Sequence, residues 1–521
     1  MFWADRVAKE IQNTRTKGKS SLLIRDEKTL SGRVHIGAMR GVAIHGLVGE
    51  VLSEYGIENE YRYELNDLDP FDTVPDSLPQ ERFKEHLGKP LHMVPSPEPG
   101  FQNFAEYYGA EFIAVHEKAG FRPTYYRATE LYGSGKMDPL VKKALERATD
   151  IRRILKNVSG SVKDASWLPV SVACEKCGKI MTTRAHDFDG ETIAYTCDKS
   201  PDDIAPCLHT GRVAPWKGRA KLFWKVDWAA KWSALGVDVE GGGKDHSTKG
   251  GARDVANHIS KEIFGYEPPF DIPYEFFLVG GRKMSSSKGH GSSAKEISDL
   301  FPSPLVRLTL IGKDISEAIN FEPEGNSVPR WYDWYDDLAE RVREGIADDF
   351  TRLFALAHFP EDRAGLTAPW QLRFSQVAFI VQMPHLSLHD EAARVKGSPL
   401  TEEETEALAE RAEYAKYWLT TYAPEGYRYT LQDMMPDVEL SETQKKALAV
   451  LADFMEVGAP SGEDIHTRLH ELKSEIPITP TELFKALYRI FLNRDSGPKA
   501  GWFLSVLPRD FVLSRLREAS T

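Results

Sequence analysis

A histidine flanked by glycines lies near the start of the chain, in the stretch SGRVHIGAMRG over residues 31–41. Apolar residues at three- and four-residue spacing over residues 36–51 predict a helix that begins beside it. The first N–H groups and the positive dipole end of such a helix stabilise a phosphate. His35 could donate a hydrogen bond to a phosphoryl oxygen on which charge develops, and Gly32, Gly37 and Gly41 let a flat ligand approach the backbone. By itself, the stretch is equally compatible with a glycine-rich turn capped by a histidine.

A second candidate for phosphate chemistry is the stretch FFLVGGRKMSSSKGHG over residues 276–291. Here a strand-like apolar run leads into a loop with Lys283, three serines and Lys288, which could wrap a polyphosphate and close on a transition state. A solvated basic loop is the alternative. Residues 211–290 carry 13 Lys and Arg against 9 Asp and Glu, although the whole chain has a net charge of −12. The net charge argues against indiscriminate nucleic-acid binding, and the locally basic stretch suits selective handling of phosphates, with an uneven scatter of charges as the alternative.

The four cysteines fall within 34 residues. Cys174 and Cys177 have the two-residue spacing of a zinc knuckle, and Cys197 and Cys207 could complete a tetrahedral site. His209 could replace Cys207, and four unrelated buried thiols are the other alternative. Four cysteines in 521 residues do not form a disulfide framework, which favours a cytoplasmic protein.

Strand and helix patterns predict how the first candidate site is positioned. Residues 20–26 and 57–67 read as strands on either side of the 36–51 helix, and this strand–helix–strand order requires a parallel sheet. Prolines accumulate over residues 69–123, which we interpret as an irregular insertion. Residues 138–157 predict one helix whose outer face could contact a phosphate backbone or simply be solvated; its basic residues are Lys142, Lys143, Arg147, Arg152, Arg153 and Lys156.

The last 200 or so residues read as successive amphipathic helices. Thr401 with Glu404, and Thr479 with Glu482, form capping boxes at two of the helix starts. No run approaches the roughly 20 apolar residues of a membrane span. A helical C-terminal domain and no membrane partner are therefore expected.

Together, TLSGRVHIGA and KMSSSKG resemble the paired motifs of class I aminoacyl-tRNA synthetases. The stretches YELNDLDPFDTVP, FWKVDWAAKWSALGVDVEGGGKDH and GPKAGWFLSVL resemble the archaeal-type class I lysyl-tRNA synthetases across nearly the whole chain. The resemblance implies a Rossmann-type parallel-sheet catalytic domain with a zinc-binding insertion, followed by an all-α anticodon-binding domain. The implied boundaries are residues 1–75 and 221–320 for the two catalytic halves, 76–220 for the insertion that meets the acceptor stem, and 321–521 for the helical domain.

The same resemblance implies the activity and its residues. The enzyme would activate L-lysine with ATP and Mg²⁺ and transfer it to tRNA(Lys), with a structural Zn²⁺ and no DNA partner. His35, Lys283 and Lys288 would be catalytic. ATP would be bound by Ser31, Gly32, Gly37, Asp245 and Ser285. Lysine would be bound by Thr29, Trp224, His246 and Tyr274, with Asp67 or Asp227 as the acid for its ammonium group.

The sequence departs from the family pattern at three places. Ala38 replaces the histidine or asparagine usual in the first motif, Ser286 replaces a lysine in the second, and RDEKTLSG lacks an upstream glycine. Three alternatives stay open: a class I synthetase for glutamate or arginine, a non-catalytic tRNA-binding paralogue, and a nucleotidylyltransferase that shares the first motif.

Overall fold

The computed structural model describes residues 1–521 except 283–292, 384–385 and 459. The chain forms two compact units. The first contains residues 1–321 and 347–366, and the second contains residues 322–346 and 367–521. None of the described helices has the length and apolar content of a membrane span.

A parallel sheet organises the first unit. β1 (Leu22–Thr29) pairs with β2 (Asn59–Asn66), which pairs with β3 (Thr124–Arg127), all in parallel. On the other side of β1, single bridges join Ile24 to Val239 and Val239 to Phe270, and the sheet continues into the pair β9 (Gly242–Gly243) and β10 (Pro273–Tyr274). The chain order of the strands therefore reverses at β1, which places a crevice at the carboxyl ends of the strands.

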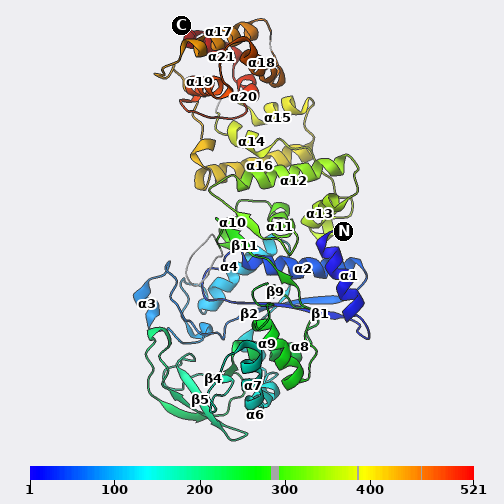
Figure 1. Ribbon diagram of the computed structural model, residues 1–521, viewed down its shortest axis with the longest axis vertical. Helices are drawn as coiled ribbons and strands as arrows, with labels where there is room; N and C mark the ends of the chain where they lie inside the picture. Colours follow the sequence, from blue (N-terminus) through cyan, green and yellow to red (C-terminus); the bar gives the residue numbers. More distant parts are fainter. Residues whose placement is uncertain (283–292, 384–385, 459) are drawn as a thin grey trace. The chain divides into compact units, whose positions relative to one another are not determined.

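Helices cover both faces of this sheet. α2 (Ala38–Glu54) lies on one side with α1 (Trp3–Arg15), and α8 (Trp224–Leu235) and α9 (Ala252–Ile259) lie on the other (Figure 1). α2 is buried along most of its length because the sheet, α1 and α11 (Ser303–Ile311) all pack against it. Further elements are β11 (Phe277–Val279) paired in parallel with β12 (Ile319–Phe321), α10 (Ala294–Ser298) and α13 (Asp349–Ala357).

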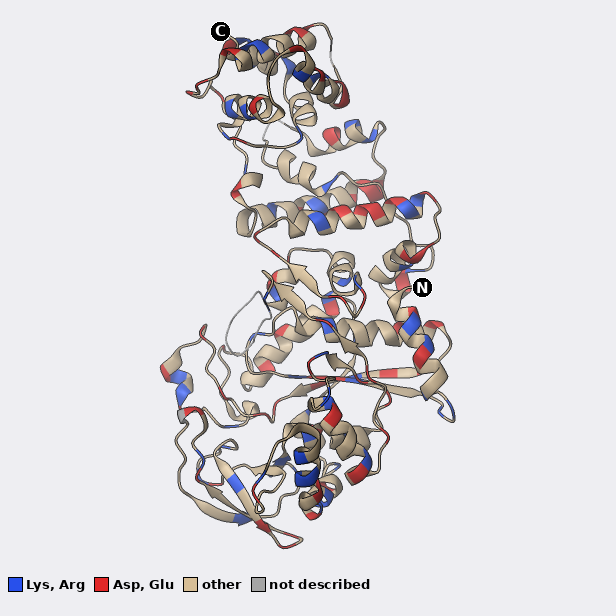
Figure 2. Ribbon diagram, viewed as in Figure 1, with Lys and Arg blue, Asp and Glu red and all other residues tan. Residues whose placement is uncertain are grey.

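The segment between β2 and α8 is more regular than the sequence indicated. The expectation of irregular chain over residues 69–123 is wrong at α3 (Gln80–Lys84) and at α4 (Phe104–Lys118), whose start is capped by the Asn103 side chain. The single helix expected over 138–157 is two helices, α6 (Asp138–Glu146) and α7 (Ala148–Ser159), because Arg147 leaves the helical conformation (φ −103°, ψ 21°). Lys and Arg residues lie along both helices (Figure 2). One of them, Arg153, already forms an ion pair with Glu262 at 2.8 Å.

The rest of this segment carries the cysteines. α5 (Ala128–Gly133) precedes two antiparallel groups of strands: β4 (Val170–Val172) with β8 (Ala220–Leu222), and β5 (Thr183–Phe188), β6 (Ile193–Cys197) and β7 (Thr210–Val213).

The described regular elements of the second unit are all helical. The expected capping boxes are present at Thr401 and Thr479. The α-helices are α12 (Ser327–Arg343), α14 (Phe374–Ile380), α15 (Leu388–Lys396), α16 (Glu402–Thr421), α17 (Glu442–Glu456), α18 (Gly462–Glu475), α19 (Pro480–Leu492), α20 (Ala500–Val506) and α21 (Arg509–Ala519).

Candidate active site

A cleft of about 360 Å³ lies at the carboxyl edge of the parallel sheet. It is formed by the end of β1, the start of α2, the start of α8 and the segments around β9 and β10. The sequence-predicted residues that line it are Thr29, His35, Gly37, Trp224, Asp245, His246 and Tyr274. Ser31 and Gly32 belong to the same turn as His35 but do not line the cleft. Lys283, Ser285 and Lys288 lie outside the described residues.

The histidine turn leads directly into α2. His35 is half-buried and lines the cleft, and the Ala38 N–H donates to its carbonyl oxygen at 3.0 Å. Gly37 is the N-cap residue and offers no side chain to the first N–H groups of α2, whose first turn contains no acidic residue. This helix start can therefore accept an anionic group from the cleft.

Gly41 has a different role from the one its motif suggested. A Cβ at this position would lie 2.6 Å from Tyr274 Oη and 2.9 Å from Asp26 Oδ2. A side chain there would displace both groups. Glycine at position 41 therefore allows Asp26 and Tyr274 to reach α2, and their two oxygen atoms face the same small space.

Asp26 is one of three cleft-lining acids, with Glu27 and Glu240, that the sequence analysis did not name. Its Oδ1 accepts from the Glu27 N–H at 2.8 Å, and His45 Nδ1 lies 3.4 Å from its Oδ2. His45 Nε2 accepts from the Gly241 N–H at 2.8 Å, so the ring proton belongs on Nδ1. No lysine or arginine among the described residues forms an ion pair with Asp26. The available signal was position alone: Asp26 lies near the carboxyl end of a strand that leads into the histidine turn.

A buried ionic network lies beneath the cleft. Arg25 contacts Glu240 at 2.6 Å, Glu64 at 2.7 Å and Glu27 at 2.5 Å. Lys231 contacts Glu64 at 2.5 Å, Asp227 at 2.8 Å and Glu27 at 3.3 Å. Against the cost of burial, Lys231 and Arg25 lower the pKa of Glu27 to about 2, so this cleft carboxylate stays ionised.

Lys221 extends this network towards Thr29. Its Nζ contacts Asp69 at 2.6 Å and Asp227 at 3.3 Å, and the Thr29 hydroxyl donates to Asp69 at 2.5 Å. The network thus places five carboxylates against three cations: Glu27, Glu64, Asp69, Asp227 and Glu240 against Arg25, Lys221 and Lys231. This excess of negative charge beside the cleft favours a cationic ligand.

The two acids expected to hold an ammonium group do not line the cleft. Asp227 is 2% exposed and bonds to Lys231 and the Tyr132 hydroxyl. Against the cost of burial, Lys231 and Lys221 lower its pKa. Asp67 accepts from the Thr129 N–H at 2.9 Å and from its hydroxyl at 2.6 Å. The structure therefore places both side chains in internal contacts.

Aromatic rings form one wall of the cleft. Trp224 stacks on Trp228 with ring centroids 6.1 Å apart and an angle of 13°, and His246 stands edge-on to Trp224. Glu240 accepts from the indole N–H groups of Trp228 and Trp232, each at 2.8 Å. This anchored wall suits the hydrocarbon stem of a long side chain.

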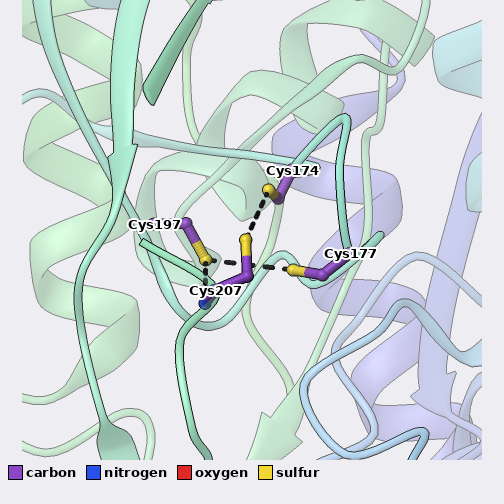
Figure 3. Close-up of side chains that lie close together, drawn as sticks. All are labelled: Cys174, Cys177, Cys197 and Cys207. Carbon is purple, nitrogen blue, oxygen red and sulfur yellow. Dashed lines mark hydrogen bonds between the residues drawn. The ribbon is translucent and has the colours of Figure 1, made fainter. Parts of the chain in front are cut away.

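The four cysteines lie together outside this cleft. Cys174 Sγ is 3.5 Å from Cys207 Sγ, and Cys177 Sγ is 3.9 Å from Cys197 Sγ (Figure 3). All four sulfur atoms lie within 4.8 Å of one another. Tetrahedral zinc with four thiolates separates the sulfur atoms by roughly 3.8 Å, so the donor set fits zinc. His209 does not belong to this group; its ring packs on Tyr195.

The reversal of strand order at β1 and the cleft beside it define a Rossmann-type ligand-binding unit. The family model described as "tRNA synthetases class I (K)" matches residues 1–358, and the chain belongs to this family. The family expected from the paired motifs is confirmed, as is an α/β catalytic domain followed by a helical region.

Curated relatives match the chain from end to end. Lysine–tRNA ligase 1 of Methanosarcina acetivorans is 35% identical over 100% of this chain and 99% of its own length. The lysine–tRNA ligase of Methanosarcina barkeri (strain Fusaro) is 34% identical over 100% of this chain and 98% of its own length. That of Pyrococcus horikoshii is 31% identical over 99% of each chain.

Proposed function

We propose that this protein is a lysine–tRNA ligase. It joins L-lysine to ATP to form lysyl-adenylate and pyrophosphate, and then transfers the lysyl group to the 3′-terminal adenosine of tRNA(Lys) in the cytoplasm. The observation that carries the proposal is the acid-rich, aromatic-walled cleft in a chain that full-length lysine–tRNA ligases match. Glutamate would meet excess negative charge there, which argues against that substrate.

In the first step a lysine carboxylate oxygen attacks the α-phosphorus of ATP, and the bond to the bridging oxygen of pyrophosphate breaks. This displacement needs alignment and charge stabilisation rather than a protein nucleophile. His35 and the N–H groups at the start of α2 would stabilise charge on the α-phosphate, with Lys283 and Lys288 on pyrophosphate. Bound Mg²⁺ would neutralise the phosphate charges. In the second step a ribose hydroxyl of the terminal adenosine attacks the lysyl carbonyl, and AMP leaves.

We assign the lysine ammonium group to Asp26 and Tyr274. Their oxygen atoms converge beside Gly41, and Asp26 has no lysine or arginine partner among the described residues. Burial and the nearby Asp26 raise the pKa of Tyr274, so its hydroxyl stays protonated and its oxygen can accept from an ammonium group. Trp224 and His246 would hold the hydrocarbon stem, and Thr29 would contact the α-carbon end.

Exchange of pyrophosphate into ATP, measured with each of the twenty amino acids and with tRNA present, tests this function. We expect exchange with lysine at least about a hundredfold above that with arginine or glutamate. Preference for arginine or glutamate would contradict the assignment in favour of a synthetase of another specificity. Absence of exchange with every amino acid would favour a tRNA-binding paralogue.

The cysteine cluster is proposed as a structural zinc site. We expect about one zinc per chain in metal analysis of the purified protein. Cys177→Ser should lower that content to below about 0.2 and the melting temperature by at least about 5 °C, because the metal would link the turn between β4 and β5 to the segment between β6 and β7. Ser166→Ala, an exposed change in the same segment, should leave both unchanged. Native protein without zinc, or unaltered zinc in Cys177→Ser, would contradict the proposal.

The second unit is proposed to read the anticodon loop. It contains a cavity of about 860 Å³ whose lining includes Tyr427, Tyr429, Trp502, Arg373 and Lys499. Unstacked RNA bases stack on aromatic rings and arginine planes, which supports this role for the helical unit.

A further inference from the structure

A second cavity of the first unit shares one wall with the candidate active site. It has a volume of about 540 Å³, and Trp224 lines both spaces. The other side chains that matter are Trp167, Phe223, Lys163, Lys199 and Lys225. A ligand in this second cavity would therefore lie next to whatever occupies the cleft.

Flat aromatic surfaces form part of this cavity. Trp167 and Phe223 stack with centroids 5.6 Å apart and an angle of 14°. The Trp167 carbonyl accepts from Arg152 at 2.8 Å, and the Phe223 N–H donates to the Pro169 carbonyl at 3.0 Å. These hydrogen bonds fix the backbone of both aromatic residues. Trp224, the first residue of α8, is 45% exposed, which is unusual for a large aromatic side chain. Such partly open rings suit a planar group that stacks on them.

Positive charge surrounds these rings. Lys163 Nζ lies 5.9 Å from the centroid of Trp167, and Lys199 Nζ lies 5.8 Å from that of Phe223. Lys225 comes from the first turn of α8. The described residues that line the cavity include no acid, and none of these three lysines forms an ion pair with a described carboxylate. The cavity thus combines aromatic stacking surfaces with lysine ammonium groups that can bind an anionic ligand.

We propose that this cavity binds the single-stranded 3′ end of the tRNA and holds the nucleotide that precedes the terminal adenosine. Aromatic rings stack on bases of any sequence, and lysines neutralise the backbone phosphates of single strands. The terminal ribose must reach the adenylate in the cleft, so the preceding nucleotide has to lie in a neighbouring space. The cavity behind Trp224 is that space. This inference rests on the proposed function.

The test uses tRNA(Lys) in which pyrrolocytidine replaces the penultimate cytidine. Stacking quenches this fluorophore, so binding to the native enzyme should lower its emission. With Trp167→Ala the quenching should be lost, and single-turnover transfer from preformed lysyl-adenylate should slow at least about tenfold. Lysine-dependent pyrophosphate exchange at saturating tRNA should stay within about twofold. Trp167→Phe keeps a stacking ring and should restore most of both signals.

The cations are tested separately. Lys163→Ala combined with Lys199→Ala should raise the KM for tRNA and reduce the slope of log KM against log salt by roughly 1.4, the value for two contacts with a single strand. A control variant with two other exposed lysines of the same unit replaced, Lys17→Ala with Lys261→Ala, should keep the native slope.

Native quenching and transfer rates in Trp167→Ala, or a native salt slope in the Lys163→Ala, Lys199→Ala variant, would overturn the inference. Failure of the proposed function looks different: native enzyme would then show no lysine-dependent exchange, whatever the fluorophore reports.

Discussion

Replacing His35 by alanine should lower kcat for lysine-dependent pyrophosphate exchange by about a hundred- to a thousandfold. The expected size is that for removing one preorganised donor from a transition-state oxyanion. His35 lines the cleft at the turn that enters α2, where a donor can reach the α-phosphate. Because that charge develops only in the transition state, the KM values for lysine and ATP should change much less than kcat.

A matched control separates this loss from a folding defect. His258→Ala removes an exposed histidine of α9 in the same unit, and it should retain native exchange. Both variants should keep the native melting temperature to within about 2 °C. An exchange rate for His35→Ala within threefold of native would contradict the catalytic role and revive the interpretation of His35 as a turn residue.

Local signals along the chain predicted much of the fold. Periodicity located β1, β2 and α2, and the capping boxes at Thr401 and Thr479 located two helix starts. α4 was missed because prolines crowd the chain before it and obscured its start. The break between α6 and α7 at Arg147 was not predicted because no glycine or proline stands at that position.

The candidate site was harder to predict where it depends on packing between distant segments. The family resemblance implied His35, Trp224, His246 and Tyr274 as site residues, and the structure brings all four to one cleft. Neither acid named from the sequence, Asp67 or Asp227, lines this cleft. Asp227 is turned into the network by Lys231 and Lys221, two cations whose positions depend on how α8 and β8 pack. The spacing of residues along the sequence does not reveal burial or ion pairing between distant segments.

Asp26→Asn should raise the KM for lysine by about a hundredfold, the largest effect expected on substrate binding. The change keeps the shape of the side chain but removes the negative charge that would face the ammonium group. Losing one partner of a buried charged contact costs about 2–5 kcal/mol, a range that includes the roughly 2.7 kcal/mol of a hundredfold change. The KM for ATP should stay within about threefold, because the nucleotide contacts that we propose are at the start of α2.

Selectivity gives a second measure of the same contact. Norleucine has lysine's hydrocarbon stem without an ammonium group, so the ratio of kcat/KM for lysine to that for norleucine should fall at least about tenfold in Asp26→Asn. Asp245→Asn changes an exposed cleft acid that we assign to ATP, and it should leave this ratio unchanged. If Asp26→Asn kept the native ratio while Glu27→Gln lost it, the ammonium group would belong to Glu27. In that case Arg25 and Lys231 would have to share their carboxylate with the substrate, and the buried network would itself be part of the lysine site.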